Sequence, residues 1–114
     1  MKPHLRRIAE LWYKANHIAP LTESETREWS ESHQANRLNK QPARAYEVVM
    51  GYLWDRAIKH ELCQVEMNLL IWALDKNLDQ YWQWRKLENC SLIAQQAGDK
   101  KWQRQIERLK EVFL

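Results

Sequence analysis

Only a few side chains in this sequence have the types and spacing that could hold a metal ion. His60 and Cys63 stand three positions apart, so a helix would place them on one face, with Glu61 and Glu66 nearby. A structural zinc ion needs four ligands, and the other histidines and Cys90 show no paired spacing. We therefore predict a surface histidine beside a buried thiol, with no metal site and no cofactor.

Reactive cysteine chemistry is the second kind of site that the residue types could support. A cysteine nucleophile needs a nearby base and an electropositive environment that lowers its pKa. Helical spacing predicts that Cys63 and Cys90, the only two cysteines, both face inward, where a thiol is normally inert. Because the chain has only two glycines, it also lacks a phosphate-binding loop, a nucleophile elbow and a dinucleotide-binding turn. We predict no catalytic residue and expect that the protein is not an enzyme.

Residues 100–110 are the main candidate for contact with nucleic acid. They are rich in basic and amide side chains, including Arg104 and Arg108, as is typical of a DNA-recognition helix. Glu107 and Glu111 lie among these positive charges, and the net charge of the whole chain is only +3. We therefore expect nucleic acid to be the less favoured partner. A small DNA-binding regulator that uses this basic helix is our alternative prediction.

Aromatic and arginine side chains are concentrated around position 82. Protein interfaces draw most of their binding energy from Trp, Tyr and Arg. Because successive helical residues are about 100° apart, Trp82 and Trp84 are displaced by roughly 200° and cannot both face one core. Either one of them meets a partner, or other helices of the bundle cover both. We predict protein binding through Trp29, Trp82 and Arg85, with contributions from Arg104 and Arg108.

The elements that must position these side chains are helices. Only two glycines and three prolines are present, and this scarcity of turn residues favours a few long helices over a sheet. Thr22 with Glu25 forms a capping-box pattern, and Gly98 is typical of a helix C-terminus. A break is predicted at residues 77–79, with one continuous helix across it as the alternative. Hydrophobic periodicity thus predicts helices at about residues 3–17, 22–39, 43–60, 62–77, 79–97 and 100–113.

Burial should differ strongly between these helices. Apolar side chains cover more than half the circumference of residues 62–74, which predicts a well-buried central helix. The helix at 22–39 has only Trp29, Ala35 and Leu38 for a buried stripe, so we expect it to be exposed, mobile or completed by a partner. A second copy could complete it, which leaves a homodimer open. We predict a single all-α domain over residues 1–114, folded as a compact, irregular bundle of five or six helices.

No segment resembles a membrane anchor or a signal peptide. The longest apolar run, residues 69–74, is far shorter than the roughly 20 residues that cross a bilayer. We therefore expect a cytoplasmic protein that does not bind membranes and whose two thiols are reduced.

Several short strings resemble a family of small uncharacterised proteins found in Bacillales genomes, prophages and related phages. The strings are residues 8–12, 21–22, 74–77, 87–94 and 99–107. Together the similar regions cover about the first 24 residues and residues 66–113, whereas residues near 30–65 look like an added helical pair.

The resemblance implies no activity, but it does imply a mobile-element setting. Small phage proteins often bind and inhibit a host protein, such as a defence effector or a MazF-type ribonuclease toxin. We accordingly expect a non-enzymatic, phage- or prophage-encoded module that binds and modulates a host protein in the host cytoplasm.

Overall fold

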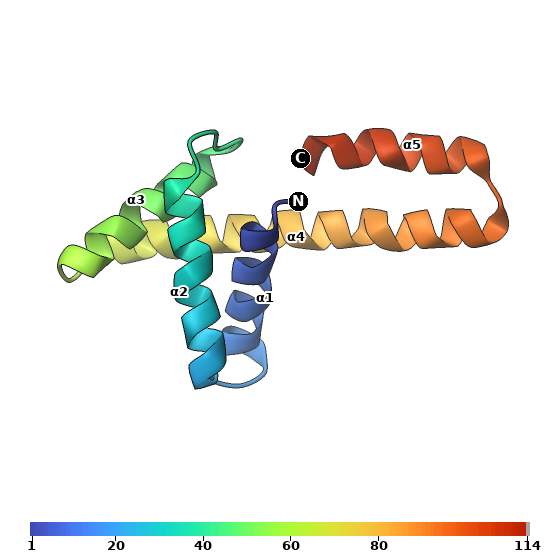
Figure 1. The fold of residues 1–114 in the computed structure, drawn as a ribbon. Coiled ribbons are helices and arrows are strands. Elements are labelled where there is room, and N and C mark those ends of the chain that lie inside the picture. The colour runs from blue at the N-terminus through green and yellow to red at the C-terminus, as the bar shows by residue number, and fades with distance from the viewer. Residues whose placement is uncertain (114) are drawn as a thin grey trace.

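The computed structural model describes residues 1–113, and within them it contains helices and no strand (Figure 1). The predicted all-α bundle is confirmed. Its elements are α1 (Pro3–His17), α2 (Glu23–Leu38), α3 (Ala45–Lys59), α4 (Gln64–Ala97), α5 (Lys100–Lys110) and a short 3-10 helix, η1 (Glu111–Phe113). None of the helices formed by residues 1–113 combines the length and the apolar content needed to span a membrane.

Local sequence signals set several helix ends. At the start of α2, the Thr22 hydroxyl accepts the Glu25 backbone N–H (3.2 Å), and the Glu25 carboxylate accepts the Thr22 N–H (3.0 Å). Gly98 ends α4 in the left-handed conformation, with φ of 69°. Asp99 then caps α5 by accepting the Trp102 N–H at 2.9 Å. The capping box and the glycine C-cap predicted from the sequence are both present.

The predicted break at residues 77–79 is wrong, because α4 runs through it without interruption. The Asn77 side chain is fully buried, and its Nδ2 donates a hydrogen bond to the Leu5 carbonyl oxygen of α1 at 2.9 Å. An asparagine breaks a helix by competing for its backbone groups, but here the amide is engaged by another helix. The result is a single helix of 34 residues, about 50 Å long.

Helix α4 organises the rest of the molecule (Figure 1). Helix α3 packs along the N-terminal part of α4, α1 packs on its middle, and α2 packs on α1 and α3 (Figure 1). Helix α5 folds back along the C-terminal half of α4 and runs antiparallel to it. The long axis of the molecule is 53 Å as a consequence, against 31 and 21 Å across.

The main hydrophobic core joins α1, α3 and α4. Its buried members are Leu5, Ile8, Tyr46, Met50, Ala73 and Leu74. The prediction that residues 62–74 are well buried holds for the inner side alone: Val65, Leu69 and Trp72 are exposed, because α1 and α3 cover only one side of α4.

Helix α2 buries polar rather than apolar residues. Ser32, His33 and Asn36 face inward, whereas Ala35 and Leu38, which were predicted to form its buried stripe with Trp29, are exposed. Helices α1 and α3 cover the inner face of α2, and most of its other residues are exposed, which is one of the alternatives predicted from the sequence. Completion of its outer side by a partner or a second copy stays a prediction.

The buried imidazole of His33 takes the place of an apolar side chain. Its ring stacks on Trp54 (centroids 4.7 Å apart, planes at 12°) and meets the edge of Trp29 at 4.4 Å. His33 is 1% exposed, and neither ring nitrogen has a hydrogen-bond partner among residues 1–113. Burial therefore lowers the pKa of His33 to about 4 and keeps the ring neutral.

Candidate partner-binding surface

The residues first considered for metal or thiol chemistry lie at the turn between α3 and α4. His60 caps the end of α3 and Cys63 occupies the N-cap position of α4, and both are exposed. The prediction of a buried Cys63 is therefore wrong: the residue starts the helix instead of packing inside it. Cys90 is half-buried. Among residues 1–113, no group of three His, Cys, Asp or Glu side chains is arranged to hold a metal ion.

Glu66, close to these residues, stabilises the start of α4. Its carboxylate accepts the Cys63 backbone N–H at 3.1 Å and forms an ion pair with Arg56 of α3. The hydrogen bond from Cys63 and the contact with Arg56 lower the pKa of Glu66 to about 2. This carboxylate is thus fixed as an anion that joins the start of α4 to α3.

Trp82 and Trp84 divide between surface and core. Trp84 is buried, with the Arg6 guanidinium 4.9 Å above its ring. Trp82 is 42% exposed, and its ring meets Tyr13 of α1 edge-on at 5.3 Å. Arg85 lies one turn further along α4 on the same side and is also exposed. We call Tyr13, Trp82 and Arg85 the aromatic–arginine face.

The charge on this face is available to a partner. Arg85 forms an ion pair with Glu88 at 3.5 Å, three positions along the same helix. Exposed pairs of this kind contribute little, about 0–1 kcal/mol, so exchange of Glu88 for a partner carboxylate costs little. The Trp82 ring, in contrast, is held by Tyr13 in a defined orientation.

Trp29 lies apart from the aromatic–arginine face. Its ring stacks on Trp12 with centroids 6.2 Å apart, contacts His33 and packs against the hydrophobic core. The structure therefore does not bring Trp29 together with Trp82 and Arg85, and its half-buried ring has a packing role.

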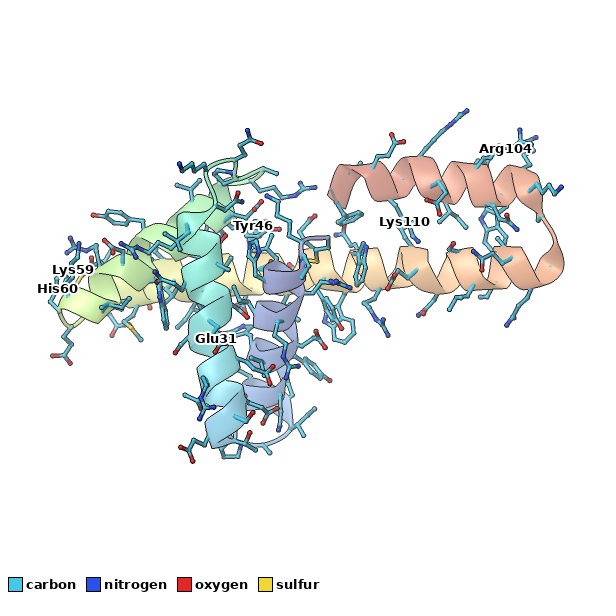
Figure 2. The ribbon with its side chains drawn as sticks, viewed as in Figure 1. Glu31, Tyr46, Lys59, His60, Arg104 and Lys110 are labelled. Carbon is cyan, nitrogen blue, oxygen red and sulfur yellow. The ribbon has the colours of Figure 1, made fainter. Side chains whose placement is uncertain are left out.

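Arg104 and Arg108 lie on α5. Figure 2 shows Arg104 on the side of α5 that faces away from α4, whereas Lys110 points toward α4. Lys100, Arg104 and Arg108 recur every four residues and line one shallow surface of the helix together with Gln103 and Glu107. Helices α4 and α5 run antiparallel, unlike the two helices of a helix-turn-helix motif, which cross at about 90–120°.

A further surface feature, which sequence reasoning missed, lies between α4 and α5. A mainly apolar groove is lined by Leu87 and Cys90 of α4 and by Leu109, Val112 and Phe113, together with Gln83 and Lys86. We call it the hairpin groove. Leu109 and Val112 are 55% and 61% exposed. The signal in the sequence is that Leu109 and Val112 are apolar and three positions apart, which places both on one side of a helix.

Part of the chain is similar to a known protein family. A model of a protein family of unknown function matches residues 50–113. This range includes most of α3, all of α4 and α5, the hairpin groove, and Trp82 with Arg85, but not α1 or α2. No curated protein and no solved structure matches the chain.

Proposed function

The chain belongs to this family, DUF7667, and from the surface of α4 we propose that it is a non-enzymatic module that binds a host protein. The observation that carries the proposal is the aromatic–arginine face, where Trp82 is exposed and held by Tyr13 next to Arg85. Trp, Tyr and Arg are the residue types that dominate binding energy at protein interfaces.

The order of this face favours binding. A long side chain normally loses about 0.5–1.5 kcal/mol of rotamer freedom when a partner immobilises it. The edge-to-face contact with Tyr13 already restricts Trp82, so less freedom remains to be lost on binding. A partner that fits would offer an apolar pocket for the indole and a carboxylate for the Arg85 guanidinium.

The resemblance to proteins of prophages and phages supports a host protein as the partner. We propose that the module acts in the host cytoplasm and modulates its target, with defence effectors and MazF-type toxins as the first classes to test. Binding would inhibit the target if it covers the target's active site or its own binding surface.

The test is capture of a partner by the tagged protein from a host lysate, identified by mass spectrometry. The double variant Trp82→Ala/Arg85→Ala is expected to lose the captured protein while its far-UV circular dichroism is unchanged. Trp72→Ala/Lys76→Ala is the matched control, because Trp72 is 43% exposed on another side of the same helix. Capture that survives the first variant, or is lost equally in both, would contradict the proposed face.

A small DNA-binding regulator is the second candidate, favoured by the row formed by Lys100, Arg104 and Arg108. Such binding rests on phosphate contacts and weakens steeply as salt rises. A gel-shift assay at low salt, with Arg104→Ala/Arg108→Ala for comparison, tests it. No shift of DNA by the wild-type protein would exclude this function.

A further inference from the structure

The C-terminal half of α4 and α5 form a helical hairpin that extends beyond the other helices (Figure 1). Two helices in contact shield only the sides that they turn to each other, so the hairpin groove between them is open to solvent along one side. Leu109 and Val112 in its wall are more than half exposed, whereas Leu87, Cys90 and Phe113 are half-buried. The groove is therefore an apolar surface that is already formed and partly wet.

The size of the groove fits a small ligand better than a second protein. It holds about 380 Å³, and pockets for small molecules usually hold about 300–1,000 Å³. Along α4 the lining runs from Gln83 to Cys90, a rise of about 10 Å. A specific protein interface buries about 800 Å² on each partner, far more than a groove of this length offers.

The polar residues of the groove indicate the charge of its ligand. Among residues 1–113, Lys86 is the one charged side chain that lines the groove, and the Gln83 amide lies one turn before it on α4. Lys86 is exposed and takes part in none of the ion pairs within these residues; Glu88, two positions further along, is paired with Arg85 at 3.5 Å. The groove can therefore bind one anionic group beside an apolar body.

We propose that the hairpin groove binds a small amphiphilic carboxylate of the medium-chain fatty-acid type. The carboxylate would lie at the Lys86 ammonium, with the Gln83 amide as a second hydrogen-bond donor. The apolar chain would lie against Leu87, Leu109 and Val112 and remove them from water. A mainly apolar site in which a few polar groups fix the orientation is the usual form of a small-ligand site.

Octanoate is the probe that tests this site. A titration of the full chain, followed by ¹H–¹⁵N NMR, measures both the affinity and the location of binding. The amide signals of the residues that line the groove should shift until they saturate. Butanoate, which has the same charge and a shorter chain, should bind about tenfold more weakly, because fewer of its methylene groups leave water. Octylammonium, which has the same chain and the opposite charge, should bind at least about fivefold more weakly, because Lys86 repels it.

Variants of the groove separate its charge from its apolar wall. Lys86→Ala should weaken octanoate binding about fivefold, the factor that corresponds to one exposed ion pair of about 1 kcal/mol. Leu109→Gln/Val112→Gln should also weaken it, with unchanged helicity, because both side chains are more than half exposed. Lys76→Ala is the matched control, since Lys76 is an exposed lysine of α4 that does not line the groove. It should keep the wild-type affinity.

Three results would overturn the proposal: no saturable shift of the groove signals with octanoate, equal affinity for octylammonium, or an unchanged affinity in Lys86→Ala. If octanoate does not bind and Leu109→Gln/Val112→Gln loses a captured host protein, the groove belongs to that protein instead. Trp82 and Arg85 do not line the groove, so octanoate binding and host-protein capture can fail separately.

Discussion

Protonation of His33 should destabilise the fold in mildly acidic solution. The imidazole lies between Trp54 and Trp29, and burial lowers its pKa from 6.5 to about 4. The folded protein binds this proton more weakly than the unfolded chain. The free energy of unfolding therefore has its full value above about pH 6.5, where His33 is neutral in both states. It decreases progressively as the pH falls toward 4. With about 1.4 kcal/mol per pH unit, the loss reaches about 2 kcal/mol at pH 5 and about 3 kcal/mol at pH 4.

Urea unfolding followed by far-UV circular dichroism measures this effect. The free energy of unfolding of the wild type should fall by about 2 kcal/mol between about pH 7.5 and pH 5. His33→Phe keeps an aromatic ring between Trp54 and Trp29 but removes the group that takes up the proton. The free energy of unfolding of this variant should therefore depend much less on pH. A residual slope is expected from His4, because burial also lowers its pKa.

His60→Gln is the matched control, since His60 is exposed at the end of α3. It should retain the wild-type dependence on pH. If wild type and His33→Phe lose the same free energy over this range, the buried imidazole is not the acid-sensitive group and the reasoning fails.

Three further changes test the packing and the helix ends. Asn77→Ala removes the buried hydrogen bond to the Leu5 carbonyl oxygen, and urea unfolding should show a loss of about 1–3 kcal/mol. Gly98→Ala puts a Cβ into open space but at φ 69°, so the loss of unfolding free energy should be only the backbone cost of about 1–2 kcal/mol. Thr22→Ala removes the side-chain cap of α2, and a decrease of about 1 kcal/mol is expected in the same assay.

The sequence predicts those features that depend on neighbouring residues. Helix ends are marked by Thr22 with Glu25 and by Gly98 with Asp99. Their hydrogen bonds join residues only a few positions apart, so they can be predicted from the sequence alone. The helical period likewise places Leu5 and Ile8 in the core.

Features that depend on distant segments were not predictable in the same way. The continuity of α4 at Asn77 rests on an acceptor 72 positions away in the sequence. His33, a residue type of only intermediate burial, lies on the inner face of α2 because Trp54, 21 positions away in α3, stacks on its ring. The aromatic–arginine face was only partly predictable: spacing separates Trp82 from Trp84, but the contact with Tyr13 exists only in three dimensions.

Because α4 is uninterrupted, it also fixes the angle around its axis between the aromatic–arginine face and the hairpin groove. Insertion of a single residue between Arg85 and Lys86 would turn the later α4 residues of the groove, Leu87 and Cys90, by about 100° around the helix axis and advance them by about 1.5 Å. An insertion of seven residues would restore the direction to within about 20° while it lengthens the helix by about 10 Å. Insertions or deletions in this segment can therefore keep the relative direction of the two surfaces only when their length is close to a whole number of helical turns. Helix α4 thus sets both the distance and the direction between the two surfaces.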